Sequence, residues 1–489
     1  MTNPSSTDDR GPLVLDFANC LAERVGEQHG LTRSEFEAGA EPMRRFTDEL
    51  AKMQDAGEIR WRQLPVDPMR KTHLNRIREI IESVNAHSEE RHGGPIKHLI
   101  VLGIGGSALG NIAIQAALRP HNWNAIPSEI RGGPCLHVLD NVDPRLIRDT
   151  IDFVRHTDPG LQRTVVNVIS KSGETAETAA QFLLFREIMK DTVGERWARH
   201  IIATTDERSG TMRSIVDHEG YESLPVPDGV GGRFSVMSPV GLFSAAMCGI
   251  DIAALLDGAA DMDKRCSDPD YRKNPAAMLA FLLISLTQKK GKWGHVLMPY
   301  CNGLYGLADW YRQLWAESLG KRHDREGNEV FTGPTPIKAL GATDQHSQIQ
   351  LYREGPNDKV VGFLEVGDFG GDFEVPGTLP NEAVEYLFGA RFRELLNAEK
   401  KATEFALVES RRPNFTIRFP NVSAHTVGQF FQLWQVATAY AGLMLNINAY
   451  DQPAVETGKK ATFGLMGRSG YEDWQQKVTD TLAETEFTI

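Results

Sequence analysis

The sequence has few cysteines, no long apolar run and no excess of positive charge. Its five cysteines stand far apart without a Cys-x-x-Cys pair, which argues against a disulfide framework and a thiolate zinc site and favours a reducing, cytoplasmic location. The longest apolar stretches, near 242–250 and 278–286, are much shorter than the ~20 residues that span a bilayer. The formal net charge of −12 disfavours nucleic acid and anionic lipid as partners. We therefore expect a protein without a nucleic-acid or membrane partner.

Metal-ligand spacing is also missing from the sequence. The 14 histidines include no His-x-x-x-His or His-x-His pair, so the pattern predicts no metal site. Residues 1–10 are polar and acidic, without the basic start and apolar middle of a secretion signal. These absences direct attention to the apolar pattern and to small polar motifs.

The length of 489 residues and the hydrophobic content of 41% allow two or three domains with ample cores. Apolar residues at helical spacing, including those near 13–17 and 69–84, predict a mostly helical N-terminal segment. From about 95 onward, predicted strands alternate with predicted helices, a pattern typical of parallel sheets in α/β proteins. The expected parts are a helical segment over 1–92 that packs on the second domain, α/β domains over 93–260 and 270–446, and a C-terminal loop and helical tail over 447–489.

The periodicity predicts most elements individually. In the second half we expect a β-rich piece near 348–352, another near 360–365, and a polar loop over 449–462. The expected strands are 98–103, 135–139, 164–169, 199–204 and 294–299; the expected helices are 107–118, 144–155, 174–190, 239–248, 275–289, 303–319, 427–446 and about 471–484.

Two runs change abruptly from a buried-strand pattern to glycine and hydroxyl residues. They are 97–107, ending in Gly105-Gly106-Ser107, and 167–175, containing Ser170-Lys171-Ser172-Gly173-Glu174-Thr175. Each precedes a helical pattern, and the first N–H groups of a helix have no partner inside it and favour an anion. An ordinary helix start needs one capping hydroxyl, whereas the second run has several beside a lysine. We predict a phosphorylated small molecule as ligand.

A dinucleotide site is an alternative interpretation of the first run. Gly103-Ile104-Gly105-Gly106-Ser107-Ala108 satisfies the pattern G-x-G-x-x-G/A after a strand. The acidic residue expected about 20 residues later is not there, because the candidate Asp140 comes 30 residues after Gly110. The glycine pattern alone leaves a nicotinamide-dependent oxidoreductase open as an alternative.

Several charged residues are candidates for chemistry. Gln313 and Glu317 lie four apart on the predicted helix 303–319 and project from the same face. Glu317 falls in the last turn, where the negative end of the helix dipole disfavours its charged form and suits general-base work. Arg233 follows two glycines, which leave its guanidinium free to meet a ligand; His346 and Lys459 lie in predicted polar loops. Taken singly, each of these is more often an ordinary surface or structural residue than a catalytic one.

Taken in order, six motifs resemble the phosphoglucose isomerase family. The likeness runs from about 97 to 460. The motifs are Gly103-Ile104-Gly105-Gly106-Ser107, Ser170-Lys171-Ser172-Gly173-Glu174-Thr175, Gly232-Arg233-Phe234-Ser235, Glu317-Ser318-Leu319-Gly320-Lys321, Gln345-His346-Ser347 and Val455-Glu456-Thr457-Gly458-Lys459. The resemblance implies an α/β fold with two SIS-type, doubly wound parallel-sheet domains, an N-terminal helical arm and a C-terminal helical tail. It also implies interconversion of glucose 6-phosphate and fructose 6-phosphate through ring opening and a cis-enediol, as in glycolysis and gluconeogenesis.

The resemblance assigns roles to individual residues. Glu317 matches the base that moves a proton between C1 and C2, Arg233 the cation beside the enediolate, and His346 and Lys459 the residues that assist ring opening. It implies a homodimer in which the histidine reaches the partner's site, and neither a metal nor a cofactor. The residues it assigns to substrate binding are Gly106, Ser107, Ser170, Lys171, Ser172, Thr175, Gln313 and Gln452.

Two departures from the family pattern leave specificity open. Small residues follow the turn at Lys171, and Pro453 interrupts the loop after Gln452, so mannose 6-phosphate is a possible second substrate. A sugar-phosphate sensor without catalysis is another alternative, which would need the phosphate-binding run but not the base.

Overall fold

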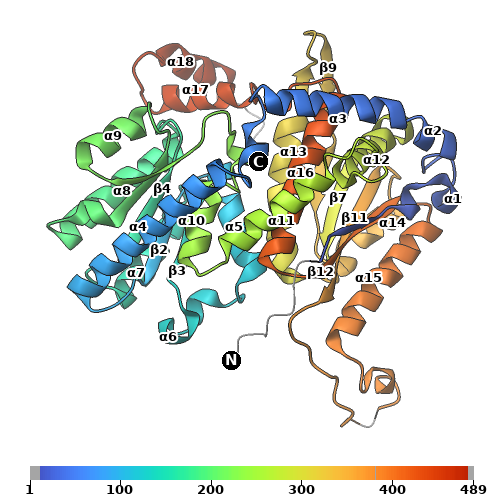
Figure 1. The fold of residues 1–489 in the computed structure, drawn as a ribbon, viewed down its shortest axis with the longest axis horizontal. Coiled ribbons are helices and arrows are strands. Elements are labelled where there is room, and N and C mark those ends of the chain that lie inside the picture. The colour runs from blue at the N-terminus through green and yellow to red at the C-terminus, as the bar shows by residue number, and fades with distance from the viewer. Residues whose placement is uncertain (1–10, 380, 483–489) are drawn as a thin grey trace.

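The computed structural model describes residues 11–379 and 381–482, and residues 1–10, which argued against a secretion signal, lie outside the described range. The chain forms two α/β lobes side by side, each built on a five-stranded sheet, with long helices between them (Figure 1). Short helices at the C-terminus stand beside the first lobe, and the segment before α15 projects from the second lobe.

The first lobe contains an all-parallel sheet with strand order β3-β2-β4-β5-β6. Leu99 lies opposite Leu136 on one side and Val165 on the other. The four strands predicted for this lobe are confirmed to within two residues. The edge strand β6 was not predicted from the sequence. The bounds are β2 (His98–Leu102), β3 (Cys135–Leu139), β4 (Thr164–Ile169), β5 (Ile201–Thr205) and β6 (Glu222–Pro225).

Helices cover both faces of this sheet, as the alternating pattern predicts. Leu99 and Val101 face one core together with residues of α5 and α10, whereas Ile100 and Leu102 face a second core with residues of α7, α8 and α9. Ser238 caps α10 by accepting a bond from the N–H of Val240, and a proline follows it. The bounds are α5 (Leu109–Leu118), α6 (Ser128–Arg131), α7 (Pro144–Thr157), α8 (Ala176–Val193), α9 (Thr211–Glu219) and α10 (Pro239–Met247).

The second lobe has strand order β1-β12-β11-β7-β10, in which only β1 is antiparallel. The helix predicted from the spacing near residues 13–17 is therefore wrong. Val14–Asp16 is a strand, because pairing with Thr416–Arg418 at the sheet edge overrides the local spacing. A separate hairpin joins β8 and β9. The bounds are β1 (Val14–Asp16), β7 (Gly294–Pro299), β8 (Lys321–His323), β9 (Glu329–Thr332), β10 (Thr335–Lys338), β11 (Lys359–Asp368) and β12 (Asn414–Asn421).

Helix α16 forms the centre of the molecule, since its residues from His425 to Leu443 are all buried. It packs against α11, α12, α13 and α3. The β-rich piece expected near 348–352 is wrong: this segment lies in the short helix α14, in which Tyr352 turns inward and bonds Gln348 one turn earlier. The bounds are α11 (Ile252–Arg265), α12 (Pro275–Lys290), α13 (Tyr305–Leu319), α14 (Ile349–Glu354), α15 (Phe392–Glu409) and α16 (Ala424–Met444).

The N-terminal segment touches both lobes. Helix α3 packs on α16 and α12 of the second lobe, where the Thr47 and Tyr440 hydroxyls lie 2.8 Å apart. Helix α4 packs along α10 and β6 of the first lobe. The linker between α3 and α4, which contains Glu58 and Trp61, therefore passes where the lobes meet. The bounds are α1 (Ala22–Val25), α2 (Arg33–Glu37), α3 (Ala40–Asp55) and α4 (Met69–His92).

The C-terminal tail forms two helices, α17 (Val455–Leu465) and α18 (Glu472–Thr481). The polar loop expected over 449–462 is wrong from residue 455 onward, so Lys459 lies on a helix. Residues 483 and 484, at the end of the predicted last helix, lie outside the described residues. Arg468 joins the tail to Glu174 at 3.1 Å.

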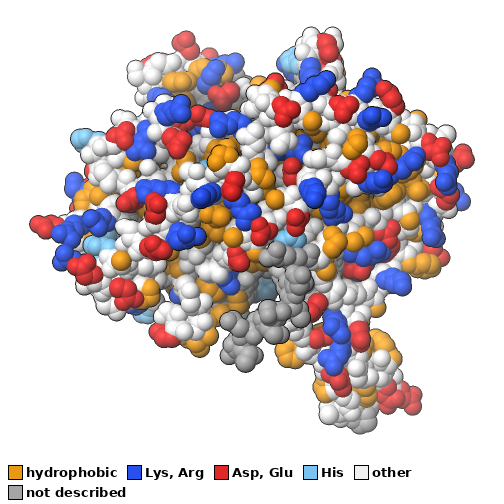
Figure 2. Space-filling model, viewed as in Figure 1, with side chains coloured by type: hydrophobic (Ala, Val, Ile, Leu, Met, Phe, Trp, Pro, Cys, Tyr) orange, Lys and Arg blue, Asp and Glu red, His pale blue; other side chains and the backbone are white. Residues whose placement is uncertain are grey.

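Acidic and basic side chains are interspersed over the face in Figure 2, without a continuous basic track. Within the described ranges, no helix combines the length and apolarity that a membrane crossing requires.

Candidate active site

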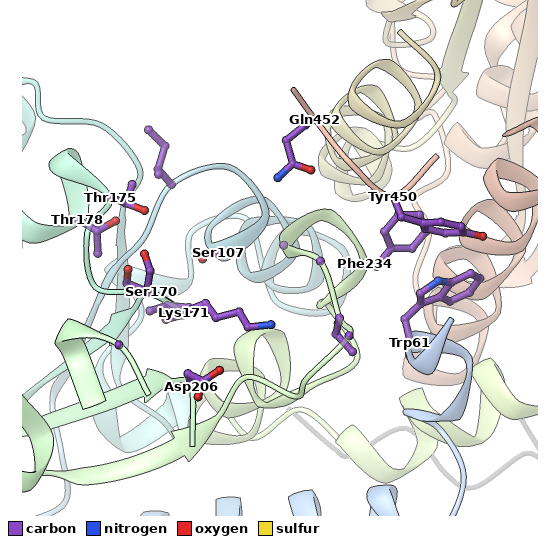
Figure 3. A pocket seen from close by; sticks show the side chains of 18 of the residues that line it. Trp61, Ser107, Ser170, Lys171, Thr175, Thr178, Asp206, Phe234, Tyr450 and Gln452 are labelled. Atoms are coloured by element: carbon purple, nitrogen blue, oxygen red, sulfur yellow. The ribbon is translucent and has the colours of Figure 1, made fainter. Parts of the chain in front are cut away.

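A cavity of about 730 Å³ opens beyond the carboxyl ends of β2, β4 and β5, the place where open parallel sheets bind ligands. Figure 3 shows hydroxyl groups on one side of it and aromatic rings on the other. Its lining comes from the first lobe, the α3–α4 linker and the C-terminal segment. These residues include Glu58, Trp61, Ile104, Ser107, Ser170, Lys171, Ser172, Thr175, Thr178, Asp206, Ser209, Gly231, Gly232, Phe234, Tyr450, Gln452 and Lys459.

The loop from Ser170 to Thr175 has the geometry of an anion site. Its backbone is held from β5, because the Ser170 N–H donates to Thr204 O (3.0 Å) and the Thr205 hydroxyl donates to Lys171 O (3.1 Å). Ser170 and Ser172 accept bonds from N–H groups of the loop itself, at 3.0 and 3.2 Å. Each hydroxyl proton can then be donated to a ligand. Thr175 is the N-cap residue of α8, yet its side chain makes no capping bond, so this hydroxyl is available at the helix end.

Charges around the loop are arranged to receive an anion. The Lys171 side chain extends across the middle of the cavity (Figure 3). Glu174, which would compete for the same helix end, bonds instead to Arg468 (3.1 Å) and to the Thr211 hydroxyl (3.3 Å). On the floor, N–H groups of Arg208 and Ser209 donate to Asp206 and lower the pKa of its carboxyl, so Asp206 is a counter-charge facing Lys171.

Two glycine turns meet back to back beside the cavity. The turn η3 (Gly105–Ser107) contacts η6 (Gly232–Phe234). A Cβ atom added to Gly106 would lie 2.2 Å from the carbonyl carbon of Gly232, whereas one added to Gly232 would have only the Gly106 Cα as neighbour, at 4.0 Å. Only glycine at 106 therefore allows the first turn to approach the second.

Arg233 and Glu317 form a buried polar group next to these turns. Arg233 is 3% exposed; its Nε donates to the Ser318 hydroxyl (2.7 Å) and one terminal nitrogen donates to Gln452 Oε1 (2.9 Å). That same nitrogen lies 3.4 Å from Glu317, and Gln313 Nε2 donates to the other Glu317 oxygen at 3.1 Å. Burial lowers the pKa of Arg233 and the Glu317 charge opposes this shift; a guanidinium nonetheless stays charged in proteins. A carboxylate is thus held beside a permanent cation.

Lys321 fixes the end of the helix that carries Glu317. Its ammonium group donates to the carbonyl oxygens of Glu317 (2.9 Å), Ser318 (2.9 Å) and Asp451 (3.0 Å). Burial and the nearby Arg233 lower the pKa of Lys321. This lysine therefore joins the last turn of α13 to the loop that presents Gln452.

The structure brings most of the sequence-predicted residues to one place. The residues of this set that line the cavity are Ser107, Ser170, Lys171, Ser172, Thr175, Gln452 and Lys459. Gly106, Arg233, Gln313 and Glu317 lie directly behind the lining, joined to it through Gly232 and Gln452. His346 is different. It is exposed in η8 (Thr343–His346) and does not line this cavity.

The aromatic wall of the cavity was not predicted from the sequence. The rings of Trp61 and Phe234 stack with centroids 5.0 Å apart, and Tyr450 lies 5.7 Å from Phe234. Phe234 and Tyr450 neighbour the motif residues Arg233 and Gln452, and that proximity could have indicated them. Trp61 and Glu58 come from the N-terminal segment, where no motif signalled a site.

The two α/β lobes with mainly parallel sheets and the hydroxyl-lined anion loop beside a glutamate and an arginine define a phosphosugar-isomerase class of protein. The sequence profile described as Phosphoglucose isomerase matches residues 60–367. The glucose-6-phosphate isomerase of Carboxydothermus hydrogenoformans is 42% identical over 98% of this chain and 99% of its own. That of Rubrobacter xylanophilus is 42% identical over 83% and 90%.

Among solved structures, one described as a hypothetical protein from Thermus thermophilus superposes with a TM-score of 0.78 at 35% identity, covering 93% of this chain and all of that one. A glucose-6-phosphate isomerase from Chlamydia trachomatis has the same fold, with a TM-score of 0.72 at 24% identity over 87% and 81%. The chain belongs to the phosphoglucose isomerase family. The predicted fold, two SIS-type lobes with an N-terminal helical arm and a C-terminal helical tail, is confirmed.

Proposed function

We propose that the chain interconverts glucose 6-phosphate and fructose 6-phosphate in glycolysis and gluconeogenesis. The observation that carries this proposal is the Glu317–Arg233–Gln313 group directly behind a cavity whose other side is the 170–175 loop. One end of the cavity suits a phosphate and the other suits proton transfer. A relative named glucose-6-phosphate isomerase, matched over 98% of this chain and 99% of its own length, supports this assignment.

Phosphate binding orients the sugar. The hydroxyls of Ser170, Ser172 and Thr175, with the backbone at Lys171, receive the phosphate at the N-terminus of α8. Gly106 and Ser107 contact sugar hydroxyls, while Gln313 and Gln452 lie beside the reacting carbons. Binding energy from the phosphate positions C1 and C2 without taking part in the reaction.

Glu317 is the base that transfers the proton. The carbonyl moves between C1 and C2 when one carboxylate removes a proton from one carbon and returns it to the other over the same face of a planar enediol. One carbon is oxidised while its neighbour is reduced, so the reaction balances within the substrate. Arg233 stabilises the negative oxygen of the enediolate, and its burial strengthens that interaction.

Ring opening is assigned to Lys459 and His346, with His346 supplied by the second subunit of a homodimer. Two observations support the dimer. His346 is exposed and does not line the cavity of its own chain, and the projecting segment around α15 exposes large apolar side chains that a partner would cover. These are Phe373, Leu379, Tyr386, Phe392 and Phe405.

The proposed location is the cytoplasm. All five cysteines are free thiols, and four of them are buried, as in proteins that fold in a reducing compartment. The sequence leaves open whether mannose 6-phosphate is a second substrate. This sugar would bind in the same site, because Gly106 and Ser107 would contact the sugar hydroxyls.

The test is turnover of fructose 6-phosphate to glucose 6-phosphate by purified protein, with a chelator present and no nicotinamide cofactor in the isomerisation step. Glu317→Gln keeps the shape and the Gln313 and Arg233 neighbours but removes the base, so kcat should fall by at least ~10³-fold. Affinity for the sugar phosphate should remain within a few-fold. Glu41→Gln, at an exposed site on α3, is the matched control and should leave kcat unchanged.

Three outcomes would contradict the proposal in different ways. Unchanged turnover in Glu317→Gln removes Glu317 from the mechanism. Absence of turnover with sugar-phosphate binding intact favours the sensor alternative. Absence of both, with binding of a nicotinamide dinucleotide, returns the glycine pattern at 103–108 to the oxidoreductase alternative.

A further inference from the structure

Three histidines meet at the end of the first lobe opposite to the cavity. His87 and His92 belong to the last turns of α4, and His200 comes directly before β5. Each places a ring nitrogen within 4.8 Å of the others. The ring centroids form a nearly regular triangle with sides of 5.9, 5.8 and 6.2 Å.

The tautomer of His200 leaves a lone pair without a protein partner. Its Nδ1 lies 2.9 Å from Thr164 O. A carbonyl only accepts, so Nδ1 carries the proton and Nε2 is the unprotonated nitrogen. His200 is 3% exposed, and its Nε2 is buried with no hydrogen-bond partner. Metal-binding histidines have this arrangement, in which one ring nitrogen donates to a carbonyl and the other ligates.

We propose that His87, His92 and His200 form a binding site for a borderline divalent metal ion, with Zn²⁺ the best match. Zn–N bonds of about 2.0–2.1 Å in a tetrahedron put the nitrogens ~3.4 Å apart, so small side-chain rotations from the present separations close the site. Three imidazoles suit Zn²⁺, Ni²⁺ or Cu²⁺, and water completes the fourth position.

The charges around the cluster have mixed signs. Arg196 and Arg199 act on His87 and oppose a cation, but both are exposed to water, which screens them. Asp158 acts on His200 with the favourable sign. The negative end of the 24-residue helix α4 also falls here and favours a cation.

A second histidine cluster in the same lobe provides a contrast. His98, Cys135 and His137 are equally close to one another. However, His98 Nδ1 lies 3.2 Å from His137 Nε2, and His98 Nε2 lies 2.7 Å from the Thr157 hydroxyl. A metal at that cluster would have to break these bonds, whereas the His200 lone pair has none to lose.

The role of the proposed metal is structural. The site joins the end of α4 to the start of β5, while the cavity lies beyond the carboxyl ends of the strands. At about 3.3 Å per residue, the length of β5 separates the two by more than ~15 Å. Metal occupancy should therefore change stability and leave kcat unchanged.

The experiment uses the full chain after treatment with a chelator and buffer exchange. Titration with Zn²⁺ at pH 7.5, followed by calorimetry, should show one tight site per chain, and Co²⁺ should give the visible absorption of a tetrahedral complex. Because a metal that binds only the folded state stabilises it, the melting temperature should rise with Zn²⁺. Loss of one ligand should cost more than the 10–100-fold in affinity that loss of an outer partner costs.

His87→Ala, His92→Ala and His200→Ala should each abolish the tight site and the Co²⁺ spectrum. His92 is partly exposed, so its variant decides the matter if the buried His200 variant fails to fold. The matched control, His137→Ala, removes a histidine from the second cluster and should leave binding unchanged. The proposal is overturned if the wild-type chain binds no more Zn²⁺ than His92→Ala, or if His137→Ala alone removes the binding.

Discussion

At Gly106, the absence of a Cβ atom allows two loops to pack closely. A Cβ at this position meets Gly232 backbone at 2.2 Å, and the atoms it meets are main-chain atoms that cannot rotate away. The glycine is therefore required for packing as well as for any contact with a sugar.

A pair of variants tests this packing argument. Gly106→Ala should lower the free energy of unfolding by about 1–3 kcal/mol, as overpacking does. Gly232→Ala, whose Cβ has 4.0 Å of room, should leave stability within about 1 kcal/mol of wild type. Chemical denaturation of both variants checks the difference. Equal losses in the two would show that the loops are free to move apart.

At the residue scale, the sequence predicts best where chemistry-bearing side chains are consecutive. Ser170 to Thr175 lie together because a strand, a turn and a helix follow one another in the chain. The bond from Arg233 to Gln452 joins residues 219 apart. From the residues themselves such a meeting is not visible, and only the resemblance to a family placed both in one site.

Among the elements, α13 depends on Lys321 at its end. The last carbonyl groups of a helix have no partner within it, and here Lys321 satisfies two of them as well as Asp451 O. Lys321→Met keeps the apolar stem but removes the donor. It should cost about 1.5–3 kcal/mol of stability and lower kcat, because the loop of Gln452 loses an anchor.

Melting temperature and steady-state kinetics measure the two effects of Lys321→Met. Lys52→Met, at an exposed position on α3, is the matched control and should change neither. A variant that melts earlier with unchanged kcat would confine Lys321 to stability and separate it from the site.

The strands and helices of the first lobe were predictable because continuous apolar runs in parallel strands differ strongly from amphipathic helices. The secondary-structure predictions are wrong where contacts with other segments, or a weak local pattern, determine the element. Val14–Asp16 becomes a strand by pairing with β12, and α14 is a short helix whose pattern resembles a strand. In α17 every residue from Val455 to Lys460 is exposed, so no apolar stripe marked it as a helix.

For the whole molecule, buried histidines predict sensitivity to acid. Burial lowers the pKa of His73, His98 and His137 to about 4 and that of His295 to about 3. The unfolded chain binds these protons near pH 6.5. The stability that these neutral histidines contribute is therefore fully present above pH 6.5 and is lost as the pH falls toward 4. Each group lowers the free energy of unfolding by up to about 1.4 kcal/mol per pH unit in that range.

His73→Leu tests this pH dependence. His73 Nδ1 is buried without a partner, so the variant loses no hydrogen bond at that atom. Its free energy of unfolding should decline less steeply between pH 6.5 and 5, by about one proton. Urea denaturation at several pH values measures the slope. His156→Leu, at an exposed position, should retain the wild-type slope, and an unchanged slope in His73→Leu would refute the assignment.

The shared site of the proposed homodimer has its own test. His346→Ala and Glu317→Gln should each be inactive alone. If His346 acts on the partner's site, mixed dimers contain one site with both defects and one with neither. Random mixing after subunit exchange should then restore roughly a quarter of wild-type activity. If His346 acts within its own chain, every site carries one defect and mixing restores nothing.

The α/β class, the two lobes, the anion loop and the candidates for acid–base chemistry could all be predicted from the amino-acid sequence. These depend on apolar periodicity and on residues that are neighbours in the chain or follow one another in a family pattern. Three features are visible in the folded structure alone: the aromatic wall that contains Trp61, the Lys321 bonds and the meeting of His200 with His87 and His92. Each of these joins segments distant in sequence, and the packing of elements, which no local pattern records, brings their side chains together.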